Sequence, residues 1–209
     1  MKNNSSTIVW IIVCIVFIVA AFVLVGRSSK KSPVLTLADP SGLSGIQSSA
    51  STPWRLSTDT LKDRLSAIGL PALATEGTVM HIHEHLDIYI DGKLVPLPAG
   101  IGVDEKDGFI SPVHVHEADN IIHVESPVVQ DFTLGQFFDI WGVMFKTGQI
   151  GGYVTTNNKY LKVYVNGTEF TGDPRKLVLD AHQEIVVTYG TQSETPNPIP
   201  QAFIFPQGY

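Results

Sequence analysis

Residues 80–97 read MHIHEHLDIYIDGKLVPL, and this stretch decides the fold of the chain. From the second residue on, histidines, an aspartate and a tyrosine alternate with mainly aliphatic side chains, which is typical of a strand with one buried face. Asp91-Gly92 is a strong signal for a two-residue turn, and this turn pairs Ile88 with Val95. The stretch therefore predicts a β-hairpin that is aliphatic on one face and rich in imidazole on the other.

A second histidine-bearing hairpin is expected in residues 113–125, VHVHEADNIIHVE. Asp119-Asn120 is the expected turn, because both residue types tolerate a left-handed backbone. This register pairs His116 with His123 on one face and leaves Val115 on the opposite, aliphatic face. The two hairpins together would gather most of the histidines on one side of a sheet.

The rest of the chain adds helices and closing strands. Thr133 is a suitable N-cap for a helix over residues 134–141, and a shorter helix is expected after Thr58. Asn166-Gly167 predicts a third hairpin, and residues 184–189 a last strand. The predicted fold class is α+β, mainly antiparallel β-hairpins with one packed helix in a β-grasp-like arrangement.

The N-terminal part has a different composition. Residues 8–25 form an unbroken apolar run, IVWIIVCIVFIVAAFVLV, which is long enough to cross most of a bilayer. No small-residue cleavage site follows it, so we expect a retained transmembrane anchor over residues 8–26 after a short tail, residues 1–7. The folded part is then expected outside the cytoplasm, because the positive-inside rule is weaker for long translocated domains.

Composition sets the remaining boundaries along the chain. Residues 27–53 are rich in Ser, Gly, Pro and Thr and predict a flexible tether. The globular β-rich domain is expected over residues 54–192, followed by a Pro-rich C-terminal tail over residues 193–209. The expected partners are the membrane, through residues 8–25, and a protein partner in the cell envelope.

Charge and cysteine content exclude several classes of function. The net charge is −6 with 14 Lys plus Arg, which does not favour a nucleic-acid-binding protein. The single cysteine, Cys14, lies in the apolar run, so the folded part has no disulfide, thiolate metal site or cysteine nucleophile.

Histidine spacing is the most informative functional feature. On a strand, residues i and i+2 point to the same side, so a His-x-His pair can chelate one ion. Imidazole with carboxylate favours zinc or copper(II), and Glu125 or Asp87 is suited to be a further ligand. Met80 leaves a mixed thioether-imidazole copper site open, and His182, which is isolated, is expected in a turn or on the surface. The predicted metal ligands are His81, His83, His85, His114, His116 and His123.

Two other functions use the same histidines. Clustered imidazoles can sense protons near their ordinary pKa of ~6.5, within a module that binds an envelope protein or ligand. A metal ion with an open coordination position could also activate water, but the sequence offers no substrate pocket or acid-base residue for an enzyme. We therefore expect a membrane-anchored protein that sequesters, delivers or senses zinc or copper, without a catalytic residue.

Two resemblances accompany these predictions. The segments TLGQFFDIWG (133–142), LKVYVNGTEF (161–170) and LVLDAHQEIVVTYG (177–190) resemble the helix and closing strands of a transcobalamin-type β-grasp domain. Residues 69–209, through GLPALATEGTVMHIHEHLDIYIDG, SPVHVHEADNIIHVESP and FTLGQFFDIWG, are similar to a widespread, uncharacterised family of histidine-rich bacterial and archaeal proteins that are anchored or secreted. The second resemblance implies a fold and a location, and it leaves the function open.

Overall fold

A computed structural model describes residues 37–209, and these form one compact unit. The predicted anchor, residues 8–26, lies outside the described residues. Within the described part, we find no helix of the length and apolar character needed to cross a membrane. Over residues 37–209 the fold is of the α+β class, mainly β-sheet with two α-helices.

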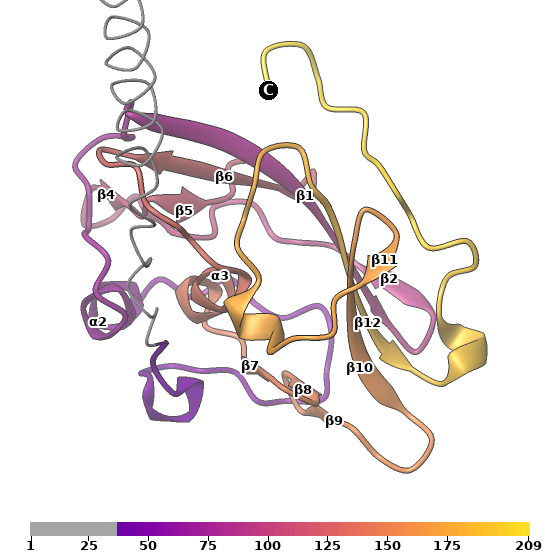
Figure 1. The fold of residues 1–209 in the computed structure, drawn as a ribbon. Coiled ribbons are helices and arrows are strands. Elements are labelled where there is room, and N and C mark those ends of the chain that lie inside the picture. Colours follow the sequence, from indigo (N-terminus) through magenta and orange to yellow (C-terminus); the bar gives the residue numbers. More distant parts are fainter. Residues whose placement is uncertain (1–36) are drawn as a thin grey trace, which may run out of the picture. The chain divides into compact units, whose positions relative to one another are not determined.

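A mixed seven-stranded sheet organises the molecule (Figure 1). Its strand order is β11-β10-β12-β1-β6-β5, and β2 also pairs with β1. The strands of this sheet are β1 (Met80–Ile90), β2 (Lys93–Val95), β5 (Val113–His114), β6 (Ile121–Ser126), β10 (Tyr160–Val165), β11 (Thr168–Glu169) and β12 (Glu184–Gly190).

The centre of the sheet is a parallel pair, β1 with β12, which differs from the expectation of hairpins alone. Their register places His85 beside Glu184 and Ile90 beside Tyr189. Parallel partners need a long crossover connection, and here it contains most of the second half of the chain. Because that contact is so remote in sequence, no local turn signal announces it.

Two of the three predicted turns have the expected register, and one is wrong. Ile88 pairs with Val95 across Asp91-Gly92, and Val165 pairs with Thr168 across Asn166-Gly167. In the histidine-bearing hairpin, however, His114 and not His116 lies opposite His123.

The register shift in that hairpin has a physical reason in its connection. Strand β5 ends at His114 and β6 begins at Ile121, so a six-residue loop replaces the predicted two-residue turn. The side chain of Asn120 fixes this loop, because its Oδ1 accepts a hydrogen bond from the backbone of Leu97 at 3.1 Å and its Nδ2 donates to Asp87 at 3.3 Å. A shift of two residues keeps every side chain on its predicted face.

The two helices belong to the core side of the molecule. α3 (Leu134–Trp141) starts at Thr133 with a complete capping box and ends at Gly142, whose backbone is left-handed. It is buried along its whole length and lies along one side of the large sheet (Figure 1). α2 (Leu61–Ala67) is short and buries Leu61 and Leu65 in the same core.

The remaining elements are short. One small sheet pairs β3 (Val103–Asp104) with β4 (Phe109–Ile110), and another joins β7 (Phe145–Lys146), β8 (Gln149–Ile150) and β9 (Tyr153–Val154). The described part of the chain also has three 3-10 helices, η1 (Pro40–Gly42), η2 (Pro174–Lys176) and η3 (Gln192–Glu194).

The described part of the expected tether differs from a free linker. Residues 37–53 lie in the same compact unit as the domain, and Gln47 forms a β-bridge with Val143. The guanidinium of Arg175 donates to the carbonyl of Ala38 while it also forms a bidentate pair with Asp139. Composition missed these contacts because they are made by the backbone, which carries hydrogen-bonding groups whatever the side chain.

Candidate metal centre

Five of the six predicted histidines gather around three neighbouring strands, with β6 between β1 and β5, and His116 lies in the loop just after β5. His123 of β6 lies opposite His83 of β1 on one side and opposite His114 of β5 on the other. One step along the same face, Glu125 lies opposite His81. The His-x-Glu pair of the central strand is thus flanked by a His-x-His pair on each side, since His116 follows His114 by two residues.

The first group of ligand atoms belongs to β1 and β6. It consists of His81, His83, His123 and Glu125, each with one ligand atom within 4.8 Å of the others. Nε2 of His81 lies 3.1 Å from Nε2 of His83 and 3.2 Å from Oε1 of Glu125. Nδ1 of His123 lies 3.4 Å from the same Oε1. These separations match the edge of about 3.3 Å expected for tetrahedral ligands at ~2.0–2.1 Å from a metal ion.

The second group belongs to β5 and β6. His114, His116, His123 and Glu125 again place their ligand atoms within 4.8 Å of one another. Nε2 of His114 lies 3.0 Å from Nε2 of His116. Nδ1 of His114 donates to the carbonyl of Ser111 at 2.9 Å, which fixes the tautomer and leaves Nε2 with its lone pair.

Most side chains of these two groups are buried, unlike the polar residues of an ordinary protein surface. His83, His123 and Glu125 are each 5 % exposed, and His114 is fully buried. Nδ1 of His123 is buried without a hydrogen-bond partner, because its contact with Glu125 lacks hydrogen-bond geometry. A buried, unpaired polar atom costs about 1–3 kcal/mol, so a cation at this point would relieve a real penalty.

Electrostatics keep the buried imidazoles neutral. Burial, reinforced by neighbouring histidines, lowers the pKa of His83 and of His114 to about 4 and that of His123 to about 3. Neutral imidazole is the form that binds a metal ion. Burial and the neighbouring Glu76 raise the pKa of Glu125 to about 7, as expected for a carboxyl group that lacks a nearby cation.

His85 does not join the other predicted ligands. Its Nδ1 is 2.9 Å from Oε2 of Glu184, and its ring stacks on Phe203 at 3.8 Å between centroids. His85, Asp87 and Glu184 form a separate group, because the parallel pairing of β1 with β12 places Glu184 directly beside His85.

His182 lies where the sequence predicted it, and the position of Met80 argues against a mixed copper site. Nε2 of His182 lies 3.1 Å from the backbone carbonyl of Tyr209, and His182 is exposed in a turn. Met80 packs against the hydrophobic core, on the face of β1 opposite His81, so it does not support a mixed thioether site.

Sequence reasoning missed two residues beside the centre. Oε1 of Glu76 lies 3.3 Å from Nε2 of His116. Glu76 is brought there by Gly77, whose missing Cβ lets the chain pass directly against the backbone of Ser126. The ring of Tyr209 covers His83 at 4.6 Å between centroids. The glycine after Glu76 was the only local signal, and none marked Tyr209.

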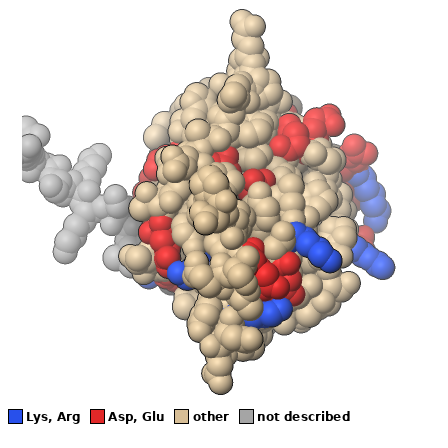
Figure 2. Space-filling view, turned by 90° about the vertical axis from the view of Figure 1, so that its right-hand side faces the viewer, with Lys and Arg blue, Asp and Glu red and all other residues tan. Residues whose placement is uncertain are grey.

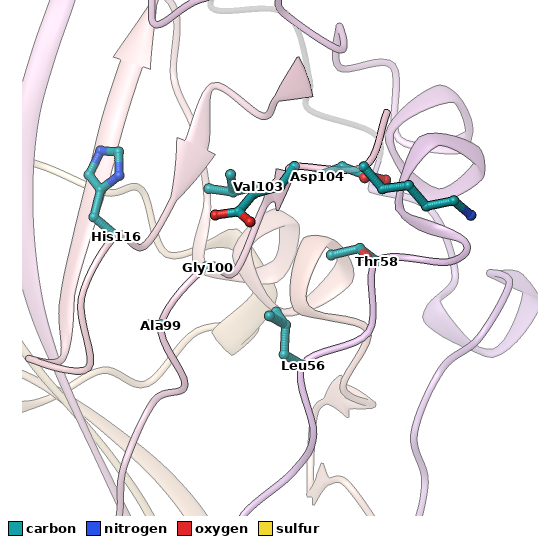
Figure 3. A pocket seen from close by; sticks show the side chains of 9 residues that line it. Leu56, Thr58, Ala99, Gly100, Val103, Asp104 and His116 are labelled. Atoms are coloured by element: carbon teal, nitrogen blue, oxygen red, sulfur yellow. The ribbon is translucent and has the colours of Figure 1, made fainter. Parts of the chain in front are cut away.

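A surface pocket of about 700 Å³ borders the centre at His116. Figure 3 shows His116 at one side of this pocket and Leu56 and Thr58 at another. Asp104, Glu105 and Lys106 also line it. The pocket gives solvent a route to the outer end of the second group.

The face drawn in Figure 2 carries its Lys and Arg side chains singly, with Asp and Glu among them. Such a mixture offers no continuous cationic surface on that face for a phosphate backbone. Comparison of the chain with protein-family models, with curated proteins and with solved structures finds no match. The case for function therefore depends on the geometry of the centre.

Proposed function

We propose that this chain is a membrane-anchored protein whose folded part binds a transition-metal ion, zinc or copper, outside the cytoplasm. The observation that carries the proposal is the first ligand group, whose four ligand atoms lie within 4.8 Å of one another and in which Nδ1 of His123 is buried and unpaired. Hydrogen bonding alone leaves that atom unsatisfied, whereas a metal ion gives it a partner.

Zinc fits this group better than copper(II). Edges of 3.1, 3.2 and 3.4 Å between ligand atoms suit a tetrahedron. A square-planar copper(II) site would need adjacent ligands at about 2.8–2.9 Å if each lay ~2.0 Å from the ion. Three imidazoles with one carboxylate also match the borderline character of zinc.

The ligand count favours a binding role over catalysis. Four protein ligands fill a tetrahedral zinc site, and a closed site holds its ion without an open position for water or substrate. The centre is therefore suited to sequestration, delivery or sensing of the ion, and we assign no catalytic residue.

The location and the finer fold are parts of the same proposal. The apolar run of residues 8–25 supports a single transmembrane anchor, and the membrane is then the first partner of the chain. A β-grasp-like description is supported by the central parallel strands β1 and β12 with α3 packed on their sheet. An envelope protein that gives or receives the ion would complete the system.

The alternative is an envelope-binding module whose histidines sense protons. Such a sensor should respond near pH 6. The buried histidines have their pKa lowered to about 4 or about 3, so they would gain charge only well below that range. This observation favours the metal-binding function.

Metal analysis of the untagged full chain, purified in detergent, tests the proposal. After chelator treatment the protein is titrated with Zn²⁺ and with Cu²⁺, alongside the double variant His83→Ala/His116→Ala. We expect stoichiometric, tight binding in the wild type and its loss in the double variant.

A matched control removes a histidine outside the centre. His182→Asn deletes one imidazole at a position where the backbone φ is +61°, which asparagine tolerates. This variant should bind like the wild type. Negligible binding by the wild type, or equal binding by the wild type and the double variant, would refute the proposed function.

A further inference from the structure

We infer that the centre holds two metal ions, with Glu125 of β6 shared between them. The inference rests on the proposed function and adds the number of ions and the bridging ligand. It starts from the fact that the candidate ligands fall into two groups that overlap only in His123 and Glu125.

The ligands are too many for one ion. Six side chains supply ligand atoms, and a tetrahedral zinc ion takes four. The six are His81, His83, His114, His116, His123 and Glu125. The members outside the overlap are one His-x-His pair on β1 and one that starts at His114, the last residue of β5.

The two pairs are built to hold separate ions. β1 and β5 are separated by β6, so their backbones lie roughly 9–10 Å apart at the usual strand spacing. Within each pair the Nε2 atoms are 3.1 Å and 3.0 Å apart. An ion at ~2.05 Å from both atoms of a pair would see them at roughly 95–100°, a usual angle for two ligands of one ion.

The central strand carries the carboxylate that can bridge. Glu125 has two carboxylate oxygens, and its Oε1 already lies 3.2 Å from His81 and 3.4 Å from His123. The ring of His123 lies between the two pairs, 4.6 Å from that of His83 and 4.7 Å from that of His116. Carboxylate-bridged ions in two-metal sites are separated by about 3.5–4 Å, which one glutamate can span.

The two His-x-His pairs are similar in their exposure, so each is equally suited to hold an ion. Each pair has one buried member, His83 or His114, and one partly exposed member, His81 or His116. The partly exposed members can be replaced with little disturbance of the core. They are therefore the positions at which each ion can be removed separately.

The stoichiometry of zinc in the full chain tests the inference. Chelator-treated protein in detergent is titrated with Zn²⁺ by calorimetry, and bound zinc is measured after buffer exchange. We expect two ions in the wild type, one in His81→Ala, one in His116→Ala and two in the control His182→Asn. One ion in the wild type would overturn the inference and leave the proposed function intact, whereas none would overturn both.

Glu125→Gln tests whether the ions share a ligand. If Glu125 bridges, this variant should weaken the binding of both ions, by roughly 10–100-fold each. If only one of two binding steps weakens, the sites are independent and the shared-ligand part is wrong. Circular dichroism of each variant without zinc checks that a lost ion does not reflect lost folding.

Discussion

Two histidine-carboxylate groups lie on the same face of β1, and only one has the features of a metal centre. Toward the start of the strand, His81 and His83 meet His123 and Glu125, and a buried ring nitrogen is left unpaired. Further along β1, His85 and Asp87 lie near Glu184, and most of their ligand atoms already form hydrogen bonds.

The other group on β1 is His85 with Asp87 and Glu184. His85 uses Nδ1 to contact Glu184, and the two oxygens of Asp87 accept hydrogen bonds from Tyr89 and Asn120. Oε1 of Glu184 alone is buried without a partner there. This group has one imidazole and two carboxylates, whereas the first has three imidazoles and one carboxylate, a set better suited to zinc.

The largest expected effect is stabilisation by zinc, which should depend on the first group and not on His85. At a free Zn²⁺ concentration about 1,000 times the Kd, binding adds about 4 kcal/mol to the free energy of unfolding and raises Tm by roughly 10 °C. Thermal unfolding of the full chain measures this. The shift should persist in His85→Ala and fall sharply in His83→Ala; an equal shift in both variants would erase the distinction between the groups.

Acid should destabilise the metal-free protein through the buried histidines His83, His114 and His123. Their folded pKa values are about 3 to 4, below the ordinary value of ~6.5, so the unfolded chain binds more protons between these values. Unfolding then takes up protons, and stability falls as pH drops from about 6.5 to about 4. The expected loss, discounted for partial solvent screening, is on the order of 3 kcal/mol, measured by urea unfolding across this range.

A buried carboxyl group on the other face of β1 opposes this trend and needs a control. Burial raises the pKa of Glu84 to about 9, so its contribution to stability is lost as pH rises from about 4.5 toward 9. In a Glu84→Gln background this opposing effect disappears, and the acid loss should be steeper. A pH profile that stays flat in that background would contradict the assignment of the lowered pKa values.

The smallest effect on stability is expected from a change in the group of His85, Asp87 and Glu184. His85→Ala should destabilise the protein by about 1–3 kcal/mol, because it leaves the buried Glu184 without its hydrogen bond and removes the stack with Phe203. Zinc stoichiometry should stay the same. A loss of zinc without loss of stability would mean that His85 is a ligand and that the two groups act as one.

Much of this arrangement could be predicted from local patterns. Alternation assigned His81, His83 and His85 to one face of a strand, and the Asp91-Gly92 turn set the register of the first hairpin. The helix Leu134–Trp141 was predicted with its Thr133 cap, because capping uses neighbours in sequence. The register of the second hairpin was wrong by two residues, because Asn120 is held by backbone and side-chain partners from elsewhere in the fold.

By itself, the sequence determined which side chains share a face, since a strand alternates every second residue whatever surrounds it. Only the tertiary structure decided which strands are neighbours. It placed β6 between β1 and β5, where two His-x-His pairs flank His123 and leave its Nδ1 unpaired. It also placed β12 beside His85, which gains a carboxylate partner. The physical reason is that strand order depends on long-range backbone pairing and core packing, to which residues far apart in the chain contribute together.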